Sequence, residues 1–155
     1  MKIILFVCTG NICRSPMAHY YMQKRVNDLN LEEKYAIDSA GIFAVTGEKS
    51  TNNAIEVMKH YNVDLSNHRA KNIHDIDLYM YDYVITLTTA QKKDILYYKK
   101  GLEGKVYTLR EFVMPSDVYK DIDDPWGLNL KVYKDCAKEI VECVDKLILK
   151  LEGSE

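Results

Sequence analysis

The chain has 155 residues, 47% hydrophobic and 28% charged, which excludes a disordered or collagen-like polypeptide and predicts one domain with its own core. Lys and Arg number 21 against 23 Asp and Glu, for a net charge of −2, which argues against a nucleic-acid-binding protein with a broad basic face. No apolar run approaches the roughly 20 residues of a membrane-spanning helix, and no signal-peptide pattern is visible, so we expect a cytoplasmic protein that binds no membrane.

Strand and helix patterns alternate along the chain. Short apolar runs rich in β-branched residues predict four strands, at residues 2–7, 35–40, 83–87 and 105–109. Helical patterns follow the strands, at residues 17–29, at about 51–61, from a cap at Thr89 onward, and at 130–151. This alternation predicts a single α/β domain over residues 1–155, with a four-stranded parallel sheet and helices on both faces.

Two local signals refine the helices. Ser15 followed by Pro16 indicates a helix start, with Ser15 as the cap and Pro16 at the first helical position. In the last helix, apolar residues recur at steps of three and four and form one buried stripe: Tyr133, Cys136, Ile140, Val144, Leu147 and Leu151. Cys136 and Cys143 lie on about the same face of this helix, so we assign both to the core.

The loop between the first strand and the first helix carries the chemistry. Its sequence is CTGNICRS from Cys8 to Ser15, and Gly10 and Asn11 both tolerate left-handed backbone angles. Its backbone N–H groups and the positive end of the helix form a cradle for phosphate, and Arg14 offers a planar group that matches two phosphate oxygens. The same field stabilises a thiolate, so Cys8 is the candidate nucleophile for covalent phosphoryl transfer.

Phosphoryl transfer to such a nucleophile needs a proton donor for the leaving group. Three acidic residues in the stretch 117–127 are candidates: Asp121, Asp123 and Asp124. The sequence Asp124-Pro125-Trp126-Gly127 is typical of a turn that could hold one carboxyl over the pocket. This turn favours Asp124, although the same acids also fit a solvated loop.

These motifs resemble the low-molecular-weight protein tyrosine phosphatase family over nearly the whole chain. The loop CTGNICRSP, directly after the first strand, is the most specific feature. Further matching segments are 38–41 (DSAG), 65–68 (LSNH) and 124–125 (DP). The resemblance implies a four-stranded parallel sheet flanked by helices, a phosphorylated protein substrate, and no metal or other cofactor.

The resemblance also implies roles for the residues of the site. Cys8 would be the nucleophile, Arg14 the ligand of the phosphate and the transition state, and Asp124 the general acid and base. Asn11 would maintain the shape of the loop, and Ser15 would hydrogen-bond the thiolate. The phosphate-binding residues would be Thr9, Gly10, Asn11, Ile12, Cys13 and Arg14.

Two residues have implied roles outside the reaction itself. His68 would order the loop framework through hydrogen bonds. Cys13 lies five residues from Cys8, and in the family such a pair can form a reversible disulfide that shields the nucleophile from over-oxidation. The alternative is that Cys13 packs as a small apolar residue.

Three related activities share this loop: tyrosine phosphatase, protein-arginine phosphatase and thiol-dependent arsenate reductase. The reductase passes a disulfide on through further cysteines in the middle of the chain. None lies between Cys13 and Cys136, so this sequence argues against an arsenate reductase. Ile12 favours phosphotyrosine, because it offers a bulky apolar wall where arginine-specific members commonly have Thr. Trp126 would stack on the substrate ring, and Phe43 would form part of the opposite wall.

Other features favour the arginine phosphatase. The segments SAGIFA at 39–44 and LTT at 87–89 resemble that branch, and Ala44 stands where many tyrosine-specific members have Trp. A non-catalytic phosphate-binding module is disfavoured because Cys8 and Asp124 are both present, and a small redox protein because no C-x-x-C motif occurs. We therefore predict a tyrosine phosphatase, with protein-arginine phosphatase as the alternative, and leave the oligomeric state open.

Overall fold

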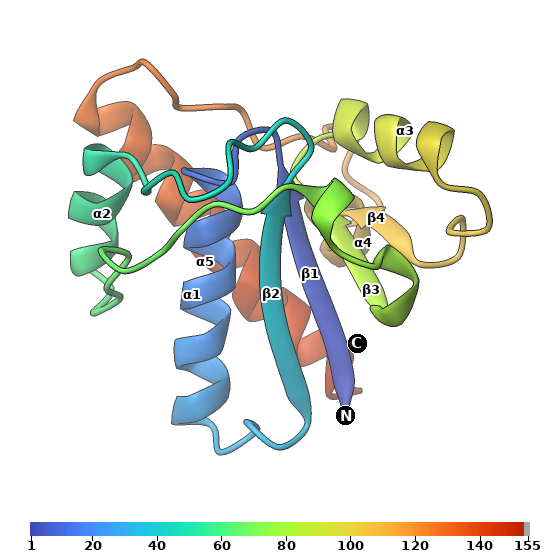
Figure 1. Ribbon diagram of the computed structural model, residues 1–155. Helices are drawn as coiled ribbons and strands as arrows, with labels where there is room; N and C mark the ends of the chain where they lie inside the picture. The colour runs from blue at the N-terminus through green and yellow to red at the C-terminus, as the bar shows by residue number, and fades with distance from the viewer. Residues whose placement is uncertain (154–155) are drawn as a thin grey trace.

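The computed structural model describes residues 1–153 and contains one parallel sheet (Figure 1). Its strands, in the spatial order β2-β1-β3-β4, are β1 (Lys2–Cys8), β2 (Tyr35–Gly41), β3 (Tyr83–Thr86) and β4 (Val106–Thr108). The helices are α1 (Arg14–Asp28), α2 (Asn52–Lys59), α3 (Thr89–Tyr98), α4 (Leu109–Val113) and α5 (Leu130–Leu151), with 3-10 turns η1 (Ile73–Asp75) and η2 (Leu78–Met80). The predicted fold class is confirmed; residues 154–155 of the predicted domain lie outside the described residues.

Helices cover both faces of the sheet because its strands are apolar on both faces. In β1, Ile4 and Phe6 belong to the core cluster with α1, α2 and α5, whereas Leu5 and Val7 belong to the cluster with α3 and the turns η1 and η2. All four side chains are fully buried. Burial of such a side chain is worth roughly 1.5–3 kcal/mol relative to exposure, so β1 is the centre of the core.

The last helix has the predicted boundaries. Asn129 caps α5 by accepting a hydrogen bond from the Val132 N–H at 3.1 Å. Its apolar stripe is buried except at Leu151, which is partly buried, and the helix packs against α1 and α2. Cys136 and Cys143 are 6% and 1% exposed, as expected of core residues.

Several element boundaries differ from the sequence prediction by one or more residues, and three of these differences involve a helix cap. Ser15 is not the cap of α1, because the helix begins one residue earlier and Ser15 lies in its first turn. Thr88, rather than Thr89, caps α3. The strand predicted at 105–109 ends at Thr108, whose side chain caps the short helix α4.

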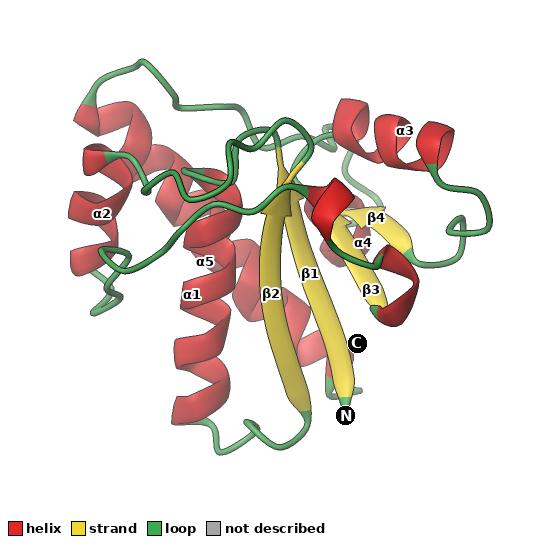
Figure 2. Cartoon of the chain, in the orientation of Figure 1, coloured by secondary structure: helices red, strands yellow, loops and turns green. Residues whose placement is uncertain are grey.

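The loops that follow the strands gather at the carboxyl edge of the sheet (Figure 2). Because β1 lies between β2 and β3, its end is flanked by the loop after β2 on one side and by the loop after β3 on the other. In open parallel sheets ligands bind at this edge, where neighbouring connections diverge. Within residues 1–153, no helix has the length and apolar character needed to cross a membrane.

Candidate active site

The loop that joins β1 to α1, called here the nucleophile loop (residues 8–15), turns its carbonyl groups outward. Three of its carbonyl oxygens accept hydrogen bonds of 2.9–3.0 Å from backbone N–H groups of the segment 42–51: those of Cys8, Thr9 and Ile12. Three of its amide N–H groups donate to no protein atom of the described chain: those of Gly10, Ile12 and Cys13. Free amides grouped in one turn form an anion-binding concavity.

Asn11 sets the shape of this loop. Its φ of 56° lies in the left-handed region, which Asn adopts more readily than most residues. Its side chain donates to Ser15 Oγ at 2.8 Å and accepts from the Lys71 N–H at 3.0 Å. Gly10 does not have a positive φ, so Asn11 makes the left-handed turn.

Gly41, at the end of β2, allows the nucleophile loop to approach the sheet. A Cβ atom at this position would lie 2.6 Å from the Thr9 carbonyl oxygen and 2.9 Å from the Asn11 nitrogen. No side chain fits at these distances, so the close approach requires glycine. Gly41 ends the DSAG segment that carries part of the family resemblance.

His68 lies behind the nucleophile loop, with only 3% of its surface exposed. Its Nε2 is 2.8 Å from the Asn11 carbonyl oxygen, and its Nδ1 is 3.2 Å from the Tyr20 hydroxyl. Burial lowers the pKa of His68 and favours the neutral ring. In that ring Nε2–H donates to the Asn11 carbonyl, and Nδ1 accepts from the Tyr20 hydroxyl.

The thiol of Cys8 is 3% exposed and receives donors from the loop. The Asn11 N–H donates to its sulfur at 3.3 Å, and Ser15 Oγ lies 3.0 Å away. Because the Ser15 oxygen accepts from Asn11 Nδ2, its own hydrogen is available for the sulfur. Both donors stabilise a thiolate, which is the form of cysteine that attacks phosphorus.

Arg14 is buried, and its guanidinium is oriented by two contacts. Nη1 donates to the Ile122 carbonyl at 2.8 Å, and Nη2 lies 3.4 Å from Asp124 Oδ2. Nε is buried and has no partner among residues 1–153. An oriented guanidinium with a free donor at the edge of a cavity is suited to bind an oxyanion.

Of the three candidate acids, Asp124 is the one that lines the cavity. Its side chain is 50% exposed. Asp121 instead accepts from the N–H and the hydroxyl of Thr89, at 2.7 and 3.0 Å. Asp123 accepts from the Tyr119 hydroxyl. The hydrogen bonds of these two neighbours leave Asp124 as the carboxyl that faces the nucleophile loop.

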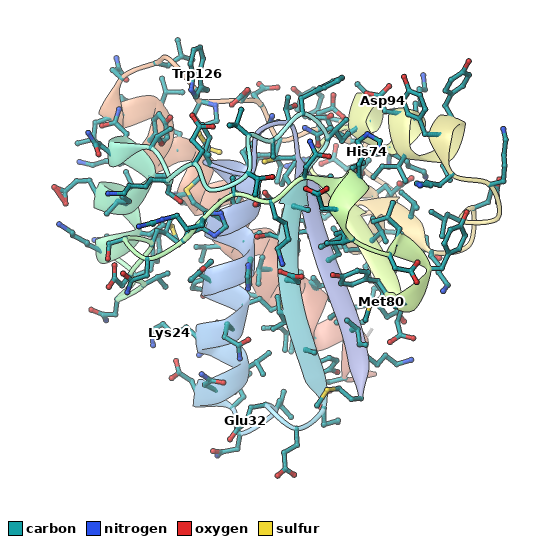
Figure 3. The ribbon with its side chains drawn as sticks, viewed as in Figure 1. Lys24, Glu32, His74, Met80, Asp94 and Trp126 are labelled. Atoms are coloured by element: carbon teal, nitrogen blue, oxygen red, sulfur yellow. The ribbon has the colours of Figure 1, made fainter. Side chains whose placement is uncertain are left out.

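The cavity at the nucleophile loop has a volume of about 320 Å³. It is lined by Cys8, Thr9, Gly10, Ile12, Cys13, Arg14, Glu48, Asp124 and Trp126. Trp126, 63% exposed, projects at the loop edge of the molecule (Figure 3). Phe43 differs from the prediction: its side chain is 72% exposed and lies outside the lining. Glu48 lines the cavity instead, and its position in the loop after β2 is the only sequence signal for it.

Two further cysteines contact the site. Burial raises the pKa of Cys13 to about 11, and its sulfur lies 3.3 Å from the Tyr133 hydroxyl. Burial raises the pKa of Cys136 to about 12, and its thiol donates to the Asp123 carbonyl at 3.8 Å. Both are therefore protonated at neutral pH. A reversible disulfide between Cys8 and Cys13 stays a prediction.

Gln91 is a supporting residue that sequence reasoning missed. Its Oε1 accepts from the N–H groups of Leu87 and Thr88, each at 3.0 Å, and its Nε2 donates to Thr9 Oγ1 at 3.2 Å. The start of α3 therefore supports the nucleophile loop through Gln91, and it contacts the loop between α4 and α5 through Asp121. A glutamine at the third position of a helix predicts a capping box, but not the contact with Thr9.

Known proteins are similar to this chain over nearly its whole length, including the residues of the site. The model of the family described as low molecular weight phosphotyrosine protein phosphatase matches residues 3–154. The low molecular weight protein-tyrosine-phosphatase PtpB of Staphylococcus epidermidis is 35% identical over 153 residues, covering 98% of this chain and 100% of its own. A protein-arginine-phosphatase of Geobacillus stearothermophilus is 33% identical over 152 residues, covering 98% and 97%.

Solved structures agree with the sequence relatives. The crystal structure of a low molecular weight protein tyrosine phosphatase from T. tengcongensis has a TM-score of 0.89 and 37% identity, covering 97% of this chain and 99% of that one. The YwlE arginine phosphatase from Geobacillus stearothermophilus has a TM-score of 0.86 and 31% identity, covering 98% and 94%. Full-length matches at these identities confirm the resemblance: the chain belongs to the low molecular weight phosphotyrosine protein phosphatase family, whose members are hydrolases.

Proposed function

We propose that this chain hydrolyses phosphotyrosine in proteins through a cysteinyl-phosphate intermediate. The observation that carries the proposal is that Cys8, Arg14 and Asp124 line one cavity. The free amides of the nucleophile loop and Arg14 Nε are donors for the oxygens of a bound phosphoryl group.

In the first step, the Cys8 thiolate attacks phosphorus. A sulfur–phosphorus bond forms while the bond between phosphorus and the phenolic oxygen breaks. Asp124 gives its proton to the departing oxygen, so tyrosine leaves as a neutral phenol. Arg14 and the loop amides stabilise the charge on the equatorial phosphoryl oxygens.

In the second step, water attacks the phosphocysteine. The Asp124 carboxylate takes a proton from that water, a phosphorus–oxygen bond forms, and the bond to sulfur breaks. The products are inorganic phosphate and the Cys8 thiolate. The Ser15 hydroxyl and the Asn11 N–H, which both contact the sulfur, stabilise the thiolate as a leaving group.

The choice of tyrosine is supported by Ile12 and Trp126, which line the cavity and suit an aromatic ring. The alternative substrate is phosphoarginine, because relatives with both names match the whole chain. The carboxylate of Glu48 in the cavity also complements a guanidinium. The cytoplasmic location expected from the sequence remains part of this proposal.

The test compares kcat/KM for a phosphotyrosine peptide and a phosphoarginine peptide of otherwise identical sequence, with purified reduced protein. We expect a preference for phosphotyrosine of at least about tenfold, and a shift toward phosphoarginine in Ile12→Thr. Cys8→Ser, the blank, should lose at least about 10⁴-fold in turnover and still bind phosphate. A preference for phosphoarginine would refute the tyrosine assignment, and near-normal turnover by Cys8→Ser would refute the nucleophile.

A further inference from the structure

Glu48 is a carboxylate in the catalytic cavity that the reaction described above does not use. It lies on the loop after β2, whereas Asp124 and Trp126 lie on the loop between α4 and α5. The backbone at Glu48 is held on both sides: its N–H donates to the Val45 carbonyl at 3.1 Å, and its carbonyl accepts from the Ala70 N–H at 2.8 Å. The loop backbone therefore presents an exposed carboxylate at a fixed place in the cavity wall.

The charge of Glu48 is not neutralised by an ion pair within the described residues 1–153. Two cations on the neighbouring segment have other partners. Arg69 donates to the carbonyls of Ser66 and His68, and Lys71 pairs with Asp38 at 2.7 Å. Glu48 is thus available to a group supplied by the substrate.

The other carboxylates near the cavity already have partners within the chain. Asp121 and Asp123 accept hydrogen bonds from Thr89 and Tyr119. Asp124 carries a proton at the start of the proposed reaction. Glu48 is the carboxylate of the lining that makes no ion pair within residues 1–153 and takes no part in the proposed proton transfer.

A carboxylate in this position has a cost for substrates that lack a positive charge. The cavity must accept a phosphoryl dianion, for which the free Arg14 Nε provides a donor. Glu48 repels that dianion, whereas a cationic group close to the phosphoryl group turns the repulsion into attraction. The same side chain therefore discriminates for one class of substrate and against another.

We propose that Glu48 is a specificity-determining residue that selects substrates with a positively charged group next to the phosphoryl group. Within the function proposed above, on which this inference rests, that group is a Lys or Arg beside the phosphotyrosine. The guanidinium of phosphoarginine is a second source of the same charge, and the experiment separates the two.

The experiment uses three phosphotyrosine peptides that differ only in the residues flanking the phosphotyrosine, which are Arg, Gln or Glu. We expect the wild-type kcat/KM for the Arg peptide to exceed that for the Glu peptide by about fivefold at low ionic strength, and the ratio to fall as salt is added. Glu48→Gln should bring the ratio below about two, and Glu48→Lys should invert it.

The matched control is Glu103→Gln, which removes an exposed carboxylate from the loop before β4, at the opposite edge of the sheet. This variant should keep the wild-type ratio. A ratio that Glu48→Gln leaves unchanged would overturn the inference, as would an equal loss in Glu103→Gln.

A phosphoarginine peptide with Gln on both sides identifies the source of the charge. If it is the only peptide hydrolysed, and Glu48→Gln raises its KM by about threefold or more, the tyrosine assignment fails while the role of Glu48 stands. If phosphotyrosine peptides are hydrolysed at equal rates whatever their neighbours, the role of Glu48 fails while the proposed function stands. If no peptide is hydrolysed, both fail.

Discussion

The two loops that meet at the catalytic cavity differ in how they are held. The nucleophile loop is mostly buried: Asn11 has no exposed surface, and Arg14 is 4% exposed. The loop that carries Asp124, called here the acid loop (residues 114–129), is largely exposed, with Val118 at 94% and Trp126 at 63%. One loop belongs to the core of the molecule, and the other lies over its surface.

The acid loop is attached at a few points rather than throughout. Arg110 binds Asp117 at 2.5 Å near its start. Asp121 accepts two hydrogen bonds at the N-terminus of α3. Ile122 donates its N–H to the Leu87 carbonyl at 2.9 Å and accepts from Arg14 at 2.8 Å. These attachments bring Asp124 to the cavity while the rest of the loop remains open to substrate.

The difference follows from what each loop must do. In the proposed reaction, the nucleophile loop must keep several N–H dipoles pointing at one place. Such an arrangement needs strong support from the surrounding structure, and it would stabilise the transition state. In the same proposal, the acid loop must place one carboxyl group and admit a protein substrate. Damage to the nucleophile loop should therefore reduce stability and all turnover, whereas damage to the acid loop should reduce only proton transfer.

The largest loss of activity among the variants that test this comparison is expected from Asp124→Asn. This change keeps the shape of the side chain and removes the proton. We expect kcat to fall about 10²–10³-fold for aryl phosphates whose phenols are poor leaving groups, and much less for activated ones. A series of aryl phosphates with different phenol pKa values measures this slope. Asp123→Asn is the control and should leave the slope unchanged; an equal loss across the series would point to a different acid.

A smaller effect, on stability as well as rate, is expected from Asn11→Ala. Ala is strained at a φ of 56°, and the Lys71 N–H loses its acceptor, so we expect a loss of about 2–3 kcal/mol in the free energy of unfolding. Urea unfolding measures this loss, and phosphate affinity and kcat should fall with it. Asn11→Gly removes the same hydrogen bonds without backbone strain, so it should be less destabilising. Equal losses in the two variants would show that backbone strain does not contribute to the loss of stability.

The smallest effect is expected from Asp121→Ala, which detaches the acid loop from α3. We expect a loss of about 3–10-fold in kcat for poor leaving groups, because Asp124 is placed less often at the correct distance. The free energy of unfolding should change by no more than about 1 kcal/mol, since the loop is exposed. Thr89→Ala removes one of the two hydrogen bonds and should have a partial effect. A large loss of kcat with activated substrates would contradict the expectation that damage to the acid loop affects only proton transfer.

Much of the fold and the nucleophile loop could be predicted because their signals are local. The apolar run at 2–7 and the stripe of α5 follow from periodicity alone. Cys8 and Arg14 lie six residues apart within one turn, so the strand before them and the helix after them limit where both can be. The role of Ser15 was only half predicted: its expected contact with Cys8 is present at 3.0 Å, but it does not cap the helix.

The sequence did not predict with equal certainty which residue of the acid loop faces the cavity. Its three candidate acids, Asp121, Asp123 and Asp124, lie within four residues of one another, and no periodicity distinguishes them. The choice depends on Thr89 and Tyr119, which donate hydrogen bonds to Asp121 and Asp123, the neighbours of Asp124. Phe43 and Glu48 present the same difficulty, because the direction of an irregular loop is not encoded in a short pattern.

The sequence by itself determined the α/β class and the position of the loop that carries Cys8 and Arg14 between β1 and α1, because these depend on residues that are close in the chain. Tertiary structure decided which carboxyl faces the nucleophile and which side chains form the cavity wall. Arg14 and the Ile122 carbonyl that orients it are 108 residues apart. Contacts of that kind are set only when the sheet brings the ends of its strands to one edge.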